Sequence, residues 1–370
     1  LKQYQSYNAF TQKINKVAAD SQFPLYDEEN DVPDDPNAYG IVKWMEGDKH
    51  VLIYDKFDIW KVDPFGKEKS IILTSGRKNL IQSRLVNLDE DKKFINSNDT
   101  ILLKTYNEKT KGSGVSKLFF GNNGKLNLVQ TTIPISDCFI TNIVQSKNST
   151  NFIFTKEKYE SSPNLYSATL SGINKFTDLN TQQASYNWGS AELFQWKAYT
   201  GKLTEGVLYK PENFDAKKKY PMIVYFYERN NQTLYNYIPP TPTPSRLNIS
   251  FFVSRGYIVF VPDIWYKNGK PGQSAYDYIV SGTRAIVKLG FVDSTKLGLQ
   301  GQSWGGYQIA HLITRTKLYA AAWAGAPVVN MTSAYGGIRW GTGINRQFQY
   351  EKSQSRIGAN LWERRDLYIE

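Results

Sequence analysis

A turn held between two glycines, Gly301 and Gly305, constrains this chain more than any other stretch. It reads Gly-Gln-Ser-Trp-Gly, with Ser303 at its apex. A short apolar stretch at residues 297–299 precedes the turn and indicates a buried strand. After the turn, the apolar spacing i, i+3, i+4 and i+7 indicates one buried face of a helix: Gly306, Ile309, Ala310 and Ile313. The sequence therefore predicts a strand, a sharp turn and a helix, with a serine hydroxyl exposed at the bend.

The pattern Gly-x-Ser-x-Gly fits the nucleophile elbow of α/β-hydrolases, in which a serine occupies a strained strand-to-helix turn. Side chains at positions 301 and 305 would collide with the neighbouring strand and helix, which explains a glycine at both. The helix that follows would point the positive end of its dipole at a developing oxyanion. Short glycine motifs also arise by chance, and the alternative is a glycine-rich turn of an ordinary α/β domain.

Length and composition indicate a globular protein large enough for two domains, with 370 residues, 41% of them hydrophobic and 21% charged. The net charge of +11 suggests nucleic-acid binding, but the lysines are scattered and no binding signature accompanies them, so we expect a solvated basic surface instead. No apolar run is long enough for a transmembrane segment. Cys138 is the only cysteine and the two histidines stand apart, so we expect no internal disulfide, no metal site and no cofactor.

From residue 38 to about 190, short strand-like runs alternate with turn signals such as Asn123-Gly124. The runs fall into groups of about four strands, and such a series is typical of consecutive propeller blades. We therefore predict a partial β-propeller of about three blades within residues 1–190. No strict motif repeats, and a β-sandwich with the same density of strands is the alternative.

Residues 191–370 predict an α/β-hydrolase domain with a doubly wound, mostly parallel sheet. The near-continuous apolar run at 222–227 is typical of a strand buried on both faces. Further strands are expected at 257–263, 297–302 and 321–329, and helices at 246–255, at 275–289 and after Ser303. In this order Ser303 lies at the carboxyl end of its strand, where open α/β sheets bind their ligands.

A serine hydroxyl needs a base that takes its proton as it attacks, and neither histidine of this chain is well placed. His311 lies about 12 Å from Ser303 along the same helix at 1.5 Å per residue and is expected to point away from the elbow. His50 lies in the strand-rich half. In α/β-hydrolases the acid and the histidine follow the serine in sequence. We therefore expect both partners beyond residue 370, and a domain that lacks its last strands.

Stabilising the developing oxyanion requires two hydrogen-bond donors. The geometry of the elbow makes the main-chain N–H of Trp304 one of them. For the second, Tyr227 ends the apolar strand on the sheet edge that faces the elbow, and its phenol is expected to reach over as a donor. From spacing alone, a capping or core role for Tyr227 is the alternative.

Residues 196–370 resemble the catalytic domain of the prolyl oligopeptidase family of serine peptidases, in particular its dipeptidyl-peptidase-like branch. The resemblance rests on four stretches: KYPMIVYFYE, YIVFVPDI, GFVDSTKLGLQGQSWGGYQ and AAAWAGAPVVNMTSAYG. It implies that Ser303 is the nucleophile, that Trp304 supplies an N–H donor and that Tyr227 is the oxyanion tyrosine. It also implies a propeller ahead of the hydrolase domain, which favours the propeller over the sandwich.

The same resemblance places Tyr335 and Arg339 near the S1 pocket, where the family binds substrate. One departure is clear: Glu228-Arg229-Asn230 replaces the small Gly-Pro turn often found after the oxyanion tyrosine, so the local pocket is expected to differ. No motif supplies the paired glutamates that bind a free N-terminus in dipeptidyl peptidases. The sequence therefore does not distinguish the release of dipeptides from other modes of cleavage.

We expect a serine peptidase that hydrolyses short peptides through an acyl-enzyme on Ser303. The alternatives are an esterase or acyl-peptide hydrolase on the same fold, and a catalytically inert fragment or interaction module. The 370 residues alone are expected to show little or no activity, because a serine without its base retains only residual catalysis. The expected partner is a peptide substrate. Oligomeric state is left open, with a homo-oligomer among the options, and a periplasmic or secreted location is favoured over the cytoplasm.

Overall fold

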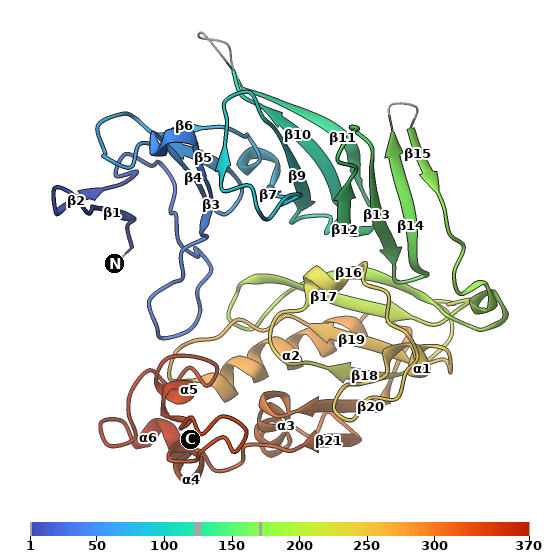
Figure 1. The fold of residues 1–370 in the computed structure, drawn as a ribbon. Helices are drawn as coiled ribbons and strands as arrows, with labels where there is room; N and C mark the ends of the chain where they lie inside the picture. The colour runs from blue at the N-terminus through green and yellow to red at the C-terminus, as the bar shows by residue number, and fades with distance from the viewer. Residues whose placement is uncertain (1, 122–126, 170–171, 370) are drawn as a thin grey trace. The chain divides into compact units, whose positions relative to one another are not determined.

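The computed structural model describes residues 2–121, 127–169 and 172–369, and within these ranges the chain forms two compact units (Figure 1). The first unit contains Leu1–Asn30, Asp35–Lys158 and Pro163–Leu179, and the second contains Asp31–Asp34, Tyr159–Ser162 and Asn180–Glu370. The domain limits expected from the sequence, 1–190 and 191–370, stay a prediction. The turn predicted at Asn123-Gly124 lies outside the described residues. None of the described helices is long and apolar enough to cross a membrane.

In the described ranges, the first unit holds a hairpin and three larger sheets, which are antiparallel except where β3 meets β8. The hairpin pairs β1 (Gln5–Asn8) with β2 (Lys13–Lys16). The first larger sheet has the order β6 (Ile71–Ile72), β5 (Ile59–Val62), β4 (Val51–Tyr54), β3 (Ile41–Met45) and β8 (Phe94–Ile95). The second has the order β11 (Leu128–Ser136), β10 (Ser113–Phe119), β9 (Thr100–Asn107) and β7 (Ile81–Leu85). The third has the order β12 (Phe139–Gln145), β13 (Phe152–Lys158), β14 (Ser161–Thr169) and β15 (Gly172–Lys175).

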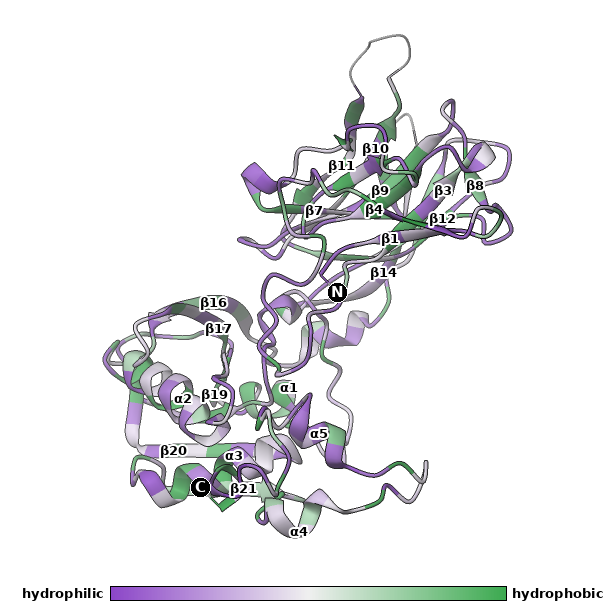
Figure 2. Cartoon of the chain, turned by 90° about the vertical axis from the view of Figure 1, so that its left-hand side faces the viewer, coloured by the Kyte–Doolittle hydropathy of each residue, from purple (hydrophilic) through white to green (hydrophobic). Residues whose placement is uncertain are grey.

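Successive sheets of the first unit share hydrophobic cores, because adjacent residues of a strand point to opposite faces. On β9, Leu103 belongs to the same core as Leu52 and Ile59 of the first sheet. The adjacent Leu102 belongs to the same core as Phe154 of the third sheet. Figure 2 shows apolar residues in green along β9 and its neighbour β10. A sandwich of two sheets has one core between them, whereas these three sheets form two cores in series.

The second unit contains a six-stranded sheet with the order β16-β17-β19-β18-β20-β21. Its last four strands in this order are parallel to one another, and an antiparallel hairpin of β16 and β17 pairs with β19 at one edge. The strands are β16 (Ser190–Lys197), β17 (Leu203–Lys210), β18 (Tyr220–Tyr225), β19 (Ile258–Pro262), β20 (Val292–Gln302) and β21 (Ala321–Gly325). The described helices are α1 (Ile249–Val253), α2 (Pro271–Val287), α3 (Trp304–Arg315), α4 (Met331–Tyr335), α5 (Gln347–Glu351) and α6 (Asp366–Ile369).

Helices cover both faces of this sheet (Figure 1). On one face, Ile279 of α2 and Ile309 of α3 join a core with Val224 of β18. On the other, Val253 of α1 joins a core with Val259 of β19. The strands are therefore apolar on both sides, which explains their near-continuous hydrophobic runs. The doubly wound, mostly parallel sheet predicted for this half is confirmed, with Ser303 at the carboxyl end of β20.

The buried face of α3 differs from the predicted one. Ile313 was expected to pack on the sheet but is 56% exposed, whereas its neighbour Leu312 is fully buried. The side chains of Trp304 and Gln308 turn inward and form hydrogen bonds with Tyr266. Positions 304, 308 and 312 lie above one another along the helix, so Leu312 falls on this buried face. Since each residue of a helix advances by about 100°, Ile313 then turns toward solvent.

Two isoleucines of α3 provide a matched test of this packing. Ile309→Ala is expected to lower the free energy of unfolding by about 2–4 kcal/mol, because Ile309 is fully buried between helix and sheet. Ile313→Ala should change it by less than about 0.5 kcal/mol, since that side chain is largely exposed. Urea denaturation of both variants measures the difference. Equal losses would contradict the packing described for α3.

Candidate active site

Ser303 lies at the bend between β20 and α3, with the backbone torsion angles φ 57° and ψ −111°. A positive φ is uncommon for a residue with a Cβ and is strained, at a cost on the order of 1–3 kcal/mol. The main-chain N–H of Ser303 donates a hydrogen bond of 2.8 Å to the carbonyl of Gly325 on β21. The strained strand-to-helix turn predicted from the Gly-x-Ser-x-Gly pattern is therefore present.

The glycines of the turn allow the helix to approach the sheet closely. A Cβ at Gly305 would lie 2.7 Å from the carbonyl oxygen of Phe226, just after β18. A Cβ at Gly301 would lie 3.0 Å from the main chain of Gly305. Gly306 is equally confined, because a Cβ there would lie 2.6 Å from the carbonyl oxygen of Gly325. The expected collision at position 305 is therefore confirmed, whereas at position 301 a Cβ would make a tight contact with the backbone of the helix.

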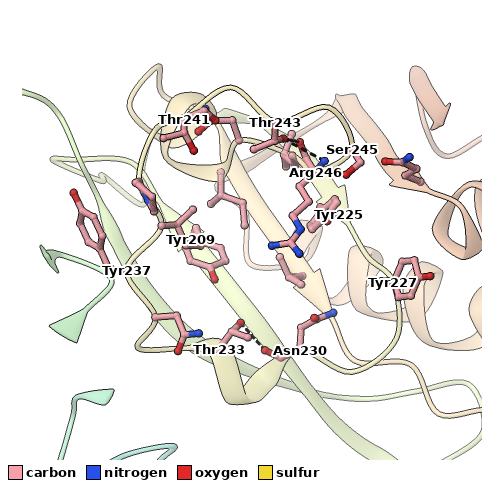
Figure 3. Close-up of a pocket in the computed structure, with 18 of the residues that line it drawn as sticks. Tyr209, Tyr225, Tyr227, Asn230, Thr233, Tyr237, Thr241, Thr243, Ser245 and Arg246 are labelled. Carbon is pink, nitrogen blue, oxygen red and sulfur yellow. Dashed lines mark hydrogen bonds between the residues drawn. The ribbon is translucent and has the colours of Figure 1, made fainter. Parts of the chain in front are cut away.

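A cavity of about 770 Å³ opens beside the elbow in the second unit. Ser303 and Tyr227, two of the residues predicted to act together, both line it. The loop between β18 and α1 supplies much of the remaining wall, including Asn230, Tyr237 and Arg246 (Figure 3). The cavity is polar and aromatic, and it is large enough for a few residues of an extended peptide.

The main chain at Tyr227 is tied to the elbow helix. Its carbonyl oxygen accepts a hydrogen bond of 2.8 Å from Gln308 Nε2 on α3 and another of 3.1 Å from the Tyr266 hydroxyl. The same hydroxyl accepts hydrogen bonds from Gln308 Nε2 at 2.9 Å and from the Trp304 indole at 3.2 Å. Burial raises the pKa of the Tyr266 phenol, so it stays protonated and can donate. These bonds fix the position of Tyr227 relative to the helix that begins after Ser303.

The segment after Tyr227 is held by a buried ion pair. Arg356 is only 3% exposed, and its guanidinium lies 3.0 Å from the carboxylate of Glu228 and 2.9 Å from that of Asp31. Further along, the main-chain N–H groups of Asn230 and Asn231 donate to the buried carboxylate of Asp263. The departure from a Gly-Pro turn noted in the sequence thus corresponds to a turn held by charged and polar side chains.

Trp304 is the first residue of α3, and no side chain caps the helix at Ser303. The Trp304 ring is buried and stacks on Tyr307, with 4.6 Å between ring centroids. This packing fixes the first turn of the helix, where the main-chain N–H groups point out of its end. The arrangement is what the predicted role of Trp304 requires, and that role itself stays a prediction.

The histidines lie elsewhere. His311 packs against α2, where a Cβ at Gly272 would lie 2.6 Å from its ring, and it lines a separate small cavity with Tyr307 and Arg315. As predicted, it does not line the cavity that holds Ser303. His50, in the first unit, lies 3.0 Å from the carboxylate of Glu68. In the part of the chain that the structure describes, no group of three or more His, Cys, Asp or Glu side chains is placed to hold a metal ion.

The two residues expected to bind substrate, Tyr335 and Arg339, are not among the described residues that line the cavity. Tyr335 is buried, donates its hydroxyl to Glu351 and packs against Tyr350 and Tyr368. Arg339 donates a hydrogen bond of 2.6 Å to Gln349 Oε1. Their assignment to the S1 pocket stays a prediction.

Sequence reasoning missed a series of hydrogen bonds that ends at Tyr227. Arg339 bonds Gln349, the Gln349 Nε2 donates to Gln354 Oε1 at 3.2 Å, and the Gln354 Nε2 donates to the Tyr227 hydroxyl at 2.8 Å. No motif signals these glutamines, because Gln354 and Tyr227 are 127 residues apart in the sequence. Only the folded chain brings them together.

A strained serine between a parallel strand and a helix, beside a polar cavity, is the arrangement of the nucleophile elbow in α/β-hydrolases. Comparison with known families is more specific. Residues 243–357, within the second unit, match the model of the prolyl oligopeptidase family. The resemblance drawn from the sequence is confirmed.

Known proteins similar to this chain include several peptidases. It is 29% identical over 183 residues to dipeptidyl peptidase 8 of Homo sapiens, and the aligned region makes up 46% of this chain and 20% of that protein. It is 28% identical over 141 residues to dipeptidyl-peptidase 5 of Porphyromonas gingivalis, which covers 34% of this chain and 19% of that protein. The matches span about a fifth of the length of these curated relatives.

Solved structures with a similar fold cover both units of the chain. A putative dipeptidyl aminopeptidase IV from Bacteroides ovatus superposes with a TM-score of 0.61 at 18% identity, covering 98% of this chain and 51% of that one. A post-proline cleaving enzyme from Rickettsia typhi superposes with a TM-score of 0.61 at 12% identity, covering 100% of this chain and 52% of that one. The chain spans about half the length of these two structures.

Proposed function

We propose that the protein is a serine peptidase that hydrolyses short peptides through an acyl-enzyme on Ser303. The observation that carries the proposal is the strained Ser303 in the lining of a cavity, within a unit whose residues 243–357 match the prolyl oligopeptidase family. The strain holds the hydroxyl away from the sheet, and the cavity gives an extended peptide access to it.

In this mechanism the Ser303 hydroxyl oxygen attacks the carbonyl carbon of the scissile peptide bond as a base removes its proton. The resulting tetrahedral intermediate collapses, the C–N bond breaks, and the leaving amine takes the proton. Water then attacks the carbonyl carbon of the acyl-enzyme as the base removes its proton. The C–O bond to Ser303 breaks, the Ser303 oxygen takes the proton, and the carboxylic acid product is released. The base in this scheme is a histidine other than His311, whose ring packs on α2.

Two donors stabilise the negative charge on the carbonyl oxygen in this proposal. One is the main-chain N–H of Trp304, at the end of α3 that carries the positive pole of the helix dipole. The other is the Tyr227 phenol, which lines the same cavity as Ser303 and remains 37% exposed. The bonds from Gln308 and Tyr266 to the Tyr227 carbonyl support this pairing, since they hold that residue against the elbow helix.

The three larger sheets of the first unit are proposed to be blades of a β-propeller. Supporting this are the two hydrophobic cores in series and the strand count of each sheet, with four or five strands in the described residues. Consecutive blades of a propeller pack face to face in this way.

Labelling with a fluorophosphonate tests the nucleophile. In the full-length protein we expect a single phosphonylated residue, Ser303, identified by mass spectrometry of tryptic peptides, and no labelling of Ser303→Ala. The reagent mimics the tetrahedral intermediate and reacts only with an activated hydroxyl. Modification of another residue, or none, would contradict the proposal. Turnover of acyl esters without turnover of peptide anilides would instead indicate an esterase on the same elbow.

Replacing Tyr227 by phenylalanine tests the second oxyanion donor. Loss of one such donor raises the barrier by roughly 3–4 kcal/mol, so Tyr227→Phe should reduce kcat about a hundredfold or more. Tyr199→Phe is a matched control, because that exposed phenol bonds Arg284 on α2 and lies outside the cavity. The measurement is the steady-state hydrolysis of a peptide anilide. An unchanged kcat in Tyr227→Phe would remove Tyr227 from the mechanism.

A further inference from the structure

The cavity beside Ser303 has one charged residue in its described lining, Arg246. The other described lining residues are tyrosines, asparagines, a glutamine, hydroxyl residues and aliphatic residues, so no carboxylate in the lining offsets this charge. Figure 3 shows the Arg246 side chain reaching from its loop toward the middle of the residues drawn, near Tyr225. A lone cation in an otherwise neutral cavity favours an anionic ligand.

The loop that carries Arg246 is held in place. The Thr243 hydroxyl accepts a hydrogen bond of 3.2 Å from the Arg246 N–H and donates to the Arg246 carbonyl. Pro242 and Pro244, on either side of Thr243, restrict the backbone further. Burial raises the pKa of the nearby Tyr225 phenol, and the charge of Arg246 partly opposes that rise. Tyr225 therefore stays neutral and does not offset the charge of the guanidinium.

We propose that Arg246 forms a subsite for a substrate carboxylate, an inference that rests on the proposed peptidase function. A guanidinium presents parallel N–H donors that match the two oxygens of a carboxylate. In a short peptide the carboxylate comes either from the C-terminus or from an Asp or Glu side chain. Both sources offer the same chemistry to Arg246, and the experiment separates them.

Two pairs of peptides provide the test in the full-length protein. One pair differs only in a C-terminal acid or amide, and the other only in Glu or Gln at each position near the scissile bond. We expect kcat/KM to favour the acid in at least one pair by about tenfold, which corresponds to about 1.4 kcal/mol. Arg246→Gln should bring the ratio close to one. Arg255→Gln should keep it, because Arg255 stacks on Phe251 and does not line the cavity.

Equal rates within both pairs, or a preference that survives in Arg246→Gln, would overturn the subsite. Binding of the same peptides to Ser303→Ala, measured by calorimetry, does not depend on turnover. A preference for the acid in that variant, without turnover in the native protein, would sink the peptidase proposal and leave the carboxylate subsite standing.

A second inference comes from the hydrogen bonds that end at Tyr227. Arg339, at the other end of the series, determines which group donates in each bond. An arginine side chain can only donate, so Gln349 must present its oxygen to Arg339. Its amide nitrogen is then left to donate to the oxygen of Gln354, and the nitrogen of Gln354 must in turn face the Tyr227 hydroxyl. The Tyr227 oxygen therefore accepts, and its own hydrogen is free to be donated elsewhere.

We infer that Gln349 and Gln354 are positioning residues that keep the Tyr227 hydroxyl turned outward as a donor. If the Gln354 amide were reversed, the Tyr227 hydrogen would be directed to Gln354 and lost to the oxyanion. Each bond in the series also polarises the next, with the Arg339 cation at its start. This inference rests on the proposed role of Tyr227 and adds the reason why its phenol is ready to donate.

Gln354→Glu tests the direction of these bonds, because an ionised carboxylate only accepts and would capture the Tyr227 hydrogen. We expect kcat to fall toward the level of Tyr227→Phe, about a hundredfold, with KM little changed. In the Tyr227→Phe background the same substitution should cost nothing further. The loss should shrink as pH falls through the pKa of the new carboxyl group, whose protonated form can donate again.

The double-mutant cycle distinguishes a wrong positioning role for Gln354 from a wrong oxyanion role for Tyr227. Independent, multiplying losses from Gln354→Glu and Tyr227→Phe, or an unchanged kcat in Gln354→Glu, would overturn the positioning role. If Tyr227→Phe itself is fully active, the oxyanion role of Tyr227 fails instead. A loss in Gln354→Glu without recovery at low pH would indicate a general disturbance and also count against the inference.

Discussion

The site depends on the close contact between the start of α3 and the end of β18. With no side chain at Gly305, the helix backbone lies against the Phe226 carbonyl oxygen, at a separation that a Cβ would not allow. This contact keeps Ser303 in its strained conformation, because the chain must turn sharply from β20 into a helix so close to the sheet. The hydrogen bond from Ser303 to Gly325 on β21 holds the other side of the bend.

The same contact places Tyr227 beside the elbow. Gln308, one helical turn beyond Trp304, donates a hydrogen bond to the Tyr227 carbonyl. The Tyr266 hydroxyl accepts hydrogen bonds from both Gln308 and Trp304. The main chain of Tyr227 is thus set by α3, while its phenol is set by Gln354 from another part of the chain. Two independent supports on one residue provide the preorganisation that a donor to a transient negative charge requires.

Features encoded in neighbouring residues were predictable from the sequence. The elbow, its glycines and the placement of His311 away from it all follow from turn sterics and helix geometry. The near-continuous apolar run at 222–227 predicted a parallel sheet covered on both sides, and Val224 and Val259 are buried in cores on opposite faces of the sheet. The turn at Ser303 is the part of the candidate site that the sequence predicted most directly, and the role of Ser303 as nucleophile stays a prediction.

Features that depend on distant contacts were not predictable. Ile313 was assigned to the buried face of α3 because its spacing fits, but the bonds of Gln308 to Tyr266 rotate the helix so that Leu312 is buried instead. Arg246 and Gln354 belong to no motif. Their proposed roles depend on the cavity that Arg246 lines and on the hydrogen bond from Gln354 to Tyr227, which only the fold creates. Local patterns therefore predicted the elbow turn that carries Ser303, and tertiary contacts determine what surrounds it.

A crystal structure of the phosphonylated full-length protein would test the central claim most directly, that Ser303 and Tyr227 meet at one reacting group. The account predicts phosphorus on Ser303 Oγ, with its free oxygen about 2.7–3.1 Å from both the Tyr227 hydroxyl and the Trp304 N–H. Gln354 Nε2 would remain bonded to the phenol oxygen. A phosphonyl oxygen turned away from Tyr227, with its phenol donating to Gln354, would contradict the account.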